Sequence, residues 1–114
     1  METMSLFDLT GCVAVVTGGN GGIGRGIAIG LAQAGAGVAV LARNDEKNRH
    51  VLEGLKPLGV PAMAVKIDIT RRAQLGPAIE EVEHTLGPVE ILVNNAGTAI
   101  MGVRWNKSRR SGTL

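Results

Sequence analysis

The sequence of 114 residues contains no tyrosine, one phenylalanine, one tryptophan and one cysteine. A lone Cys12 cannot form an intrachain disulfide bond and is typical of a reducing compartment. No apolar run approaches the roughly 20 residues that a helix needs to span a bilayer, so we expect no membrane partner. The N-terminal segment contains the acids Glu2 and Asp8 and has no long apolar region, so it does not resemble a secretory signal peptide. We therefore expect a cytoplasmic protein.

Patterns that bind metals or nucleic acids are also lacking. Two separated histidines, His50 and His84, and one cysteine give no metal-site spacing, so we predict no metal. Charge is unevenly distributed: residues 1–100 carry eight Lys or Arg against ten Asp or Glu, and residues 101–114 carry four basic residues and no acid. A basic segment can attract nucleic acid, but no aromatic platform accompanies this one. We expect no nucleic-acid partner.

The most informative stretch that is present lies at 13–24, where an apolar strand runs into a glycine-dense turn and then into a helix. Its glycines fit G-x-G-x-x-G, ending at Gly24, and T-G-x-x-x-G-x-G, starting at Thr17. Such a junction directs backbone N–H groups and the positive end of a helix dipole at one point, which suits a phosphate. A tight turn without a ligand is the alternative. Arg25 and Gly26 follow where a P-loop has Lys and Ser or Thr, which excludes a P-loop.

The rest of the sequence alternates short apolar runs with helical periods. We expect strands at 12–16, 38–42, 62–67 and 89–93, and helices at about 22–34, 44–58 and 70–86. Pro77 either kinks the third helix or marks a later start. The inward face of the first helix is predicted to consist of Ile23, Ile27, Ala28, Leu31 and Ala34. This alternation predicts an α/β fold, a doubly wound parallel sheet with about four strands and three helices.

The polar clusters of the sequence follow the predicted strands. They lie at 17–24, at Arg43, at Asp68 and at 94–97. Because the carboxyl ends of parallel strands meet at one edge of a sheet, we expect these clusters to form a single ligand site there.

Three of these motifs resemble the successive signatures of the short-chain dehydrogenase/reductase family. They are TGGNGGIG at 17–24, Asp68-Ile69-Thr70, and Asn-Asn-Ala-Gly at 94–97, in the family's order and spacing. The resemblance covers about residues 6–98, and the opening segment is most similar to the gluconate and deoxygluconate dehydrogenase branch. It implies the N-terminal part of a Rossmann-type nucleotide-binding fold.

The resemblance also implies which residues hold a dinucleotide. The turn would wrap the pyrophosphate and adenosine ribose, Asp68 would accept from the adenine amino group, and Asn94 would tie neighbouring strands together. As residue-based alternatives, Asp68 caps the third helix and the two asparagines merely end a strand. The cofactor-binding residues are predicted to be Gly18, Asn20, Gly21, Gly22, Ile23, Gly24, Arg43, Asp68, Ile69, Asn95, Ala96 and Gly97.

Arg43 bears on the choice of cofactor. A site selective for NAD usually has an acid at the end of the second strand for the ribose 2′-OH, whereas an Arg accommodates a 2′-phosphate. Here Ala42 stands at the acid position and Arg43 follows it. Asp45 and Glu46 are the counterargument, but they are typical of a first helical turn. The sequence therefore favours NADP over NAD.

The catalytic residues of the family have no counterparts in this sequence. In the family a Tyr exchanges a proton with the substrate oxygen, supported by a Lys, a Ser and an Asn that lie beyond the last matched motif. This sequence has no tyrosine, so we assign no catalytic residue. A small-molecule substrate is expected for a full-length form only. The family is usually homo-oligomeric, but the oligomer-forming part is absent here.

The resemblance ends at about Thr98, which divides the chain into an incomplete NAD(P)-binding domain at 1–98 and a divergent basic tail at 99–114. The tail lacks helical and strand periodicity, and a truncated or frameshifted reading frame is the favoured explanation. A natural short paralogue is the alternative. We expect the fourth strand to be an exposed apolar edge and the chain to be marginally stable and prone to aggregation.

Three functional interpretations follow. The favoured one is a catalytically incomplete fragment of an NAD(P)-dependent oxidoreductase that acts on an alcohol/carbonyl pair, with a sugar acid as candidate substrate. The second is a nucleotide-binding or interaction module without catalysis. The third is a methyltransferase-type nucleoside binder, which expects an acid where Arg43 follows the second strand.

Overall fold

The computed structural model describes residues 8–18, 21–95 and 100–103. Its strands are β1 (Val13–Thr17), β2 (Gly37–Ala42), β3 (Ala62–Lys66), β4 (Ile91–Asn94) and β5 (Ile100–Val103). Its helices are α2 (Gly22–Gln33), α3 (Asp45–Leu55), the short 3-10 helix η1 (Lys56–Leu58) and α4 (Arg72–Leu86). No helix in these ranges is long and apolar enough to cross a membrane.

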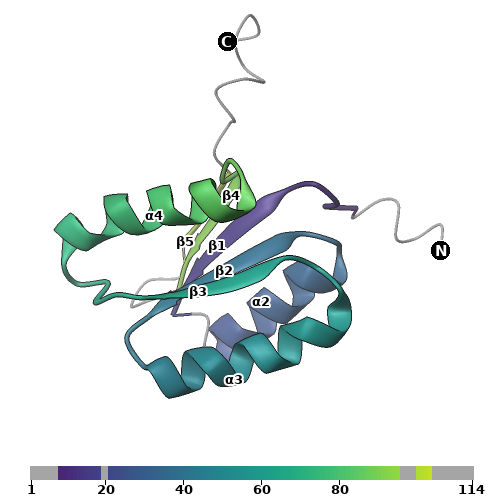
Figure 1. The fold of residues 1–114 in the computed structure, drawn as a ribbon, viewed down its shortest axis with the longest axis horizontal. Helices are drawn as coiled ribbons and strands as arrows, with labels where there is room; N and C mark the ends of the chain where they lie inside the picture. The colour runs from purple at the N-terminus through teal and green to yellow at the C-terminus, as the bar shows by residue number, and fades with distance from the viewer. Residues whose placement is uncertain (1–7, 19–20, 96–99, 104–114) are drawn as a thin grey trace, which may run out of the picture.

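The described strands form one sheet in the order β3-β2-β1-β4-β5 (Figure 1). The first four are parallel, and β5 runs antiparallel to β4. Strand order reverses at β1, because the chain adds β2 and β3 on one side of it and β4 on the other. The predicted α/β, doubly wound parallel sheet with four parallel strands and three helices is confirmed.

The helices cover both faces of the sheet, with α2 and α3 on one face and α4 on the other (Figure 1). Val16 of β1 packs with Ala28 of α2 and Val51 of α3. Val15, its neighbour in β1, points to the other face and packs with Val82 of α4. Every residue of β1 is buried, because both faces of a parallel sheet need apolar cover.

Helix α3 begins where the sequence predicts. The Asn44 side chain accepts a hydrogen bond from the backbone N–H of Lys47 at 2.9 Å, which satisfies a free donor of the first turn. Gly59 follows η1 with a φ of 75°, a left-handed conformation that suits glycine after a helical segment. Pro77 lies inside α4, which starts before it at Arg72, so a later start is excluded.

The predicted exposed edge at β4 is wrong. Segment 100–103 pairs with β4 along its whole length, with Ile91 opposite Val103 and Asn94 opposite Ile100. The backbone of β5 thus supplies hydrogen-bonding groups to the side of β4 that faces away from β1. A strand of four residues that contains a glycine carries too little periodicity to be recognised in the sequence. This strand lies past residue 98, where the family resemblance was expected to end.

Candidate functional site

The carboxyl ends of the parallel strands bring the predicted clusters to one edge, on the left in Figure 1. Thr17 ends β1 between Leu41 of β2 and Asn94 of β4 in the strand register. Arg43 and Asp68 follow the ends of β2 and β3. We call this side the carboxyl edge. It contains the point of order reversal, where open α/β sheets bind ligands.

The glycine turn between β1 and α2 needs glycine at two positions. Gly18 has a φ of 65° and Gly22 a φ of 55°, both in the left-handed region that disfavours side chains. The backbone N–H of Gly18 donates to the Leu41 carbonyl oxygen at 2.9 Å, which anchors the start of the turn to β2.

Gly24 is needed for a different reason, because a side chain there has no room. A Cβ atom at this position would collide with the carbonyl oxygen of Gly18 and would lie 2.7 Å from Nδ2 of Asn95. Gly24 is buried in the first turn of α2. Its missing side chain lets the start of the helix press against the turn, which is the third glycine's role in a dinucleotide-binding junction.

The N-terminus of α2 is open to an anion. Its N-cap residue, Gly21, makes no side-chain capping bond, and the first turn holds no acid. The first N–H groups of a helix have no partner within the helix, and the dipole places partial positive charge there. With glycine as its N-cap residue and no acid in its first turn, this helix start suits a phosphate.

A hydrogen-bond network joins β1 to β4 beside the turn. The Thr17 hydroxyl donates to Oδ1 of Asn94 at 2.9 Å and accepts from the backbone N–H of Asn95 at 3.0 Å. Nδ2 of Asn95 donates to the Gly18 carbonyl oxygen at 3.5 Å. Asn94 therefore ties neighbouring strands, as the resemblance implies. Thr17 was missing from the predicted site residues, although the T-G-x-x-x-G-x-G pattern begins with it.

A pocket of about 270 Å³ lies at the carboxyl ends of β1, β2 and the segment after β3. It brings together three predicted site residues, Gly18, Arg43 and Ile69. One charged member, Lys47, is not among the predicted site residues, although its position in the first turn of a helix that follows β2 was an available signal. The remaining lining residues are Leu41, Ala42, Asn44 and Ile67.

Asp68 closes a local turn before α4. Its Oδ1 accepts from the Thr70 hydroxyl at 2.6 Å and from the Thr70 backbone N–H at 3.0 Å, and Arg71 lies 3.8 Å from Oδ2. These Thr70 bonds, above all the hydroxyl's, hold the pKa of Asp68 below its ordinary value of 3.8, with smaller effects of Arg43 and Arg71. The N-cap of α4 is Arg71, so Asp68 does not cap that helix.

The predicted inward position of Ile23 is wrong, because its side chain is 76% exposed. The buried stripe of α2 consists of Gly24, Ala28 and Ala32, whose small size allows the helix to approach the sheet closely. Centring the helix on that stripe turns Ile23 outward, at the start of the helix next to the glycine turn. A large exposed apolar side chain at this place is free to contact a ligand.

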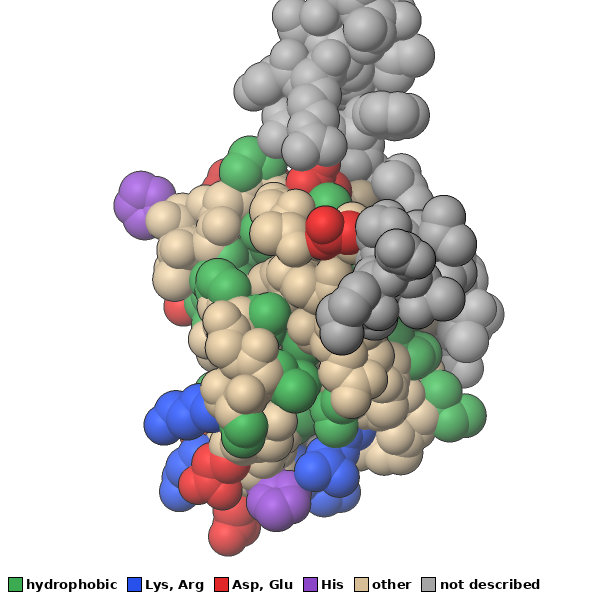
Figure 2. Space-filling view, turned by 90° about the vertical axis from the view of Figure 1, so that its right-hand side faces the viewer, with side chains coloured by type: hydrophobic (Ala, Val, Ile, Leu, Met, Phe, Trp, Pro, Cys, Tyr) green, Lys and Arg blue, Asp and Glu red, His purple; other side chains and the backbone are tan. Residues whose placement is uncertain are grey.

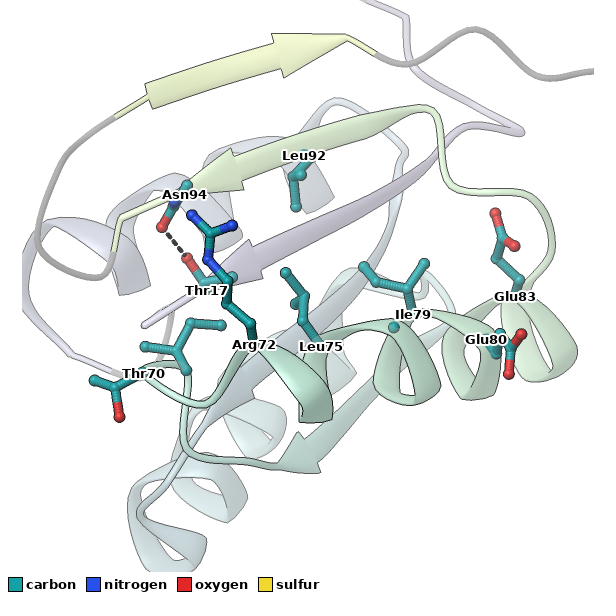
Figure 3. A pocket seen from close by; sticks show the side chains of 11 residues that line it. Thr17, Thr70, Arg72, Leu75, Ile79, Glu80, Glu83, Leu92 and Asn94 are labelled. Atoms are coloured by element: carbon teal, nitrogen blue, oxygen red, sulfur yellow. Dashed lines mark hydrogen bonds between the residues drawn. The ribbon is translucent and has the colours of Figure 1, made fainter.

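A larger hollow, of about 830 Å³, lies on the α4 side of the sheet (Figure 3). Leu75 and Ile79 of α4 face Leu92 of β4 across it, and Thr17 and Asn94 lie at one end. Among the described residues of the glycine turn, only Thr17 lines it. The phosphate-binding features therefore belong to the junction with α2, on the other side of the sheet.

The opposite, amino-terminal edge of the sheet offers a contrast (Figure 2). Positive and negative side chains lie mixed at its lower end, so this view shows no patch of one sign.

Three predicted site residues, Asn20, Ala96 and Gly97, lie outside the described residues. Within the described ranges, no group of three His, Cys, Asp or Glu residues is placed to hold a metal.

Comparison with known proteins gives relatives that match most of this chain. This chain is 43% identical over 89 residues to 7alpha-hydroxysteroid dehydrogenase of Escherichia coli strain K12, and the match covers 78% of this chain and 35% of that protein. It is 37% identical over 97 residues to gluconate 5-dehydrogenase of Gluconobacter oxydans, covering 85% of this chain and 38% of that protein. The chain thus spans little more than a third of the length of these relatives.

Solved structures agree with the sequence relatives. L-sorbose reductase from Gluconobacter frateurii, in complex with NADPH and L-sorbose, superposes with a TM-score of 0.75 at 35% identity, covering 81% of this chain and 35% of that one. A model of the family described as short chain dehydrogenase matches residues 12–110. As its three motifs predicted, the chain belongs to the short-chain dehydrogenase family.

Proposed function

We propose that the carboxyl edge binds NADP(H), as the nucleotide-binding part of an oxidoreductase that acts on an alcohol/carbonyl pair. The observation that carries the proposal is the start of α2, which has glycine as its N-cap residue and no acid in its first turn, and which presses against the glycine turn at Gly24. Free N–H groups and the dipole would hold the diphosphate there. Gly18, Ile23 and the Asn95 segment surround the same junction.

The preference for NADP over NAD is supported by Arg43. Its side chain is exposed at the pocket of 270 Å³, and Ala42 occupies the place of the acid that would bind a ribose 2′-OH. The similar L-sorbose reductase structure holds NADPH. Ile67 and Ile69 line the pocket and would contact the adenine, with Asp68 beside them.

The chemistry of the proposed oxidoreductase is hydride transfer between the nicotinamide and a substrate carbon. The cofactor supplies or takes the hydride, and the residues described here bind and orient it. The sequence offers no tyrosine for the proton transfer that accompanies this step. We therefore propose that the residues of this sequence bind the cofactor and do not supply that proton transfer.

The proposal is tested by titrating the folded chain with NADPH, NADH and S-adenosylmethionine, followed by NADPH fluorescence and by calorimetry. We expect saturable binding with NADPH tightest. Gly24→Ala should weaken NADPH binding about tenfold or more, a change of roughly 1.4 kcal/mol, because the added methyl group forces α2 away from the turn.

Gly30→Ala is the matched control, since Gly30 is also in α2 and a Cβ there meets nothing within 4 Å. It should bind NADPH like the wild type and be as stable or slightly more so. Circular dichroism establishes that each variant is folded. Binding of S-adenosylmethionine in preference to NADPH, or of no nucleotide by folded protein, would overturn the proposal.

A further inference from the structure

A second cation lies in the pocket that contains Arg43. Lys47 lines this pocket from the first turn of α3, while Arg43 lines it from the loop between β2 and α3. Both side chains are exposed at the carboxyl edge, on the same side of the pocket as the end of β2. Gly18 and Ile69 form its other walls.

Two asparagines, the N-cap residue Asn44 and the buried Asn48, fix the backbone position of Lys47. Asn44 accepts from the Lys47 backbone N–H at 2.9 Å, so the helix begins at a defined residue. Asn48, only 2% exposed, donates from Nδ2 to the Ala42 carbonyl oxygen at 3.1 Å. The first turn of α3 is thereby tied to the end of β2, which fixes the Lys47 backbone at the wall of the pocket.

The acids near this pair of cations have closer partners, although the charge of Asp68 also acts on Arg43. Asp45 lies 3.7 Å from Lys66, on the adjacent strand β3, and Asp68 is engaged by Thr70 and Arg71. No ion pair joins a carboxylate to Arg43 or Lys47 among the described residues. Two cations beside an open pocket suit a phosphate group, which carries two negative charges, better than they suit the two neutral hydroxyl groups of a ribose.

We infer that Lys47 is a specificity-determining residue, which binds the 2′-phosphate of NADP(H) together with Arg43. This inference rests on the proposed function of the carboxyl edge. Arg43 supplies a planar guanidinium that can donate two parallel hydrogen bonds, and Lys47 supplies a compact ammonium charge. NAD(H), which has a hydroxyl at this position, gains little from Lys47.

The test compares Lys47→Gln with wild-type protein by titration with NADPH, NADH and 2′,5′-ADP. We expect NADPH and 2′,5′-ADP to bind about tenfold more weakly to Lys47→Gln, with NADH unchanged within about twofold, because one charge-assisted contact is lost. Lys47→Arg should restore most of the preference. Lys56→Gln, an exposed lysine past the end of α3, is the control for net charge and should leave all three affinities unchanged.

The outcomes separate this inference from the proposed function. Wild-type protein that prefers NADPH, with Lys47→Gln retaining the full preference, overturns the role of Lys47 and leaves the proposed function standing. Equal weakening of NADPH and NADH also overturns it, because the lysine would then act on the whole dinucleotide. Wild-type protein that binds no dinucleotide overturns the proposed function and this inference together.

Discussion

Gly24 shows how one missing side chain can shape the proposed binding site. The carbonyl oxygen of Gly18 and Nδ2 of Asn95 occupy the space that a methyl group would need. Close contact between the helix start and the turn brings free N–H groups to the carboxyl edge. The sequence pattern identified this residue, because the spacing of the glycines carries the geometric requirement.

Other residues could not be assigned from the pattern. Ile23 fits the helical period of Ile27, yet it is exposed, because the small residues Ala28 and Ala32 decide which face of α2 approaches the sheet. Lys47 is one of several charged residues at the start of a predicted helix, and the sequence does not show which of them faces the pocket. The exposure of Ile23 and the position of Lys47 at the pocket both depend on how a helix is rotated against the sheet, which is a property of the tertiary structure.

Asp68 leads to a prediction about acid stability. Its pKa is lowered mainly by the Thr70 hydroxyl and backbone N–H, so the charged carboxylate favours the folded state. A group with a lowered pKa contributes stability above its unfolded value, ordinarily 3.8, and this contribution is lost as pH falls through the folded value. Wild type should therefore be more stable than Asp68→Asn at pH 7, and the difference should shrink below about pH 4.

Denaturant unfolding of the two proteins between pH 7 and pH 3 measures this difference. Asp8→Asn is a useful comparison, since the pKa of Asp8 is lowered in the same way by Thr10, in the segment before β1. A gap between wild type and Asp68→Asn that stays constant down to pH 3 would contradict the assigned hydrogen bonds.

At the scale of elements, the sheet was predictable and its edge was not. Apolar runs bounded by glycine or proline placed the four parallel strands within about two residues of their observed bounds. Burial on both faces makes such strands continuously apolar, which is a strong signal. Strand β5 has only four residues, one of them a glycine, so the sequence gives no periodic pattern from which its pairing with β4 could be predicted.

The pairing of β5 with β4 predicts protection of two sets of amides in hydrogen exchange. Successive N–H groups of a strand point to opposite sides, so alternate residues of Ile91–Asn94 donate toward β1 and toward β5. In a variant that ends at residue 99, the set directed away from β1 should exchange faster, while the other set stays protected. Equal exchange of both sets in the two proteins would show that β5 does not pair in solution.

At the scale of the whole molecule, the two faces of the sheet are unequally covered. Helices α2 and α3 pack on one face, and α4 packs on the other, beside the hollow of about 830 Å³ (Figure 1). An exposed β4 was one reason to expect aggregation, and that reason no longer holds for the described strands. Aggregation and marginal stability stay predictions, as does a cytoplasmic location.

The proposed binding site depends on the molecule as a whole, because its parts come from four strand ends. The family resemblance placed Gly18, Arg43 and Ile69 in one site, and the structure brings these three to one pocket. Their distance in sequence is bridged by parallel crossovers, each of which returns the chain to the same edge. The resemblance could not supply the charge balance of the pocket, which depends on the pairing of Asp45 with Lys66.

The most direct test of the account is a titration of ¹⁵N-labelled protein with NADPH, followed by amide chemical shifts. Binding at the carboxyl edge predicts the largest shifts at 21–24, from the start of α2, and at 43–47, around the pocket of Arg43 and Lys47. Amides at the opposite edge, such as those of Gly11 and Val60, should change little. Shifts confined to that opposite edge, or none at saturating NADPH, would contradict the claim that the glycine turn binds a dinucleotide.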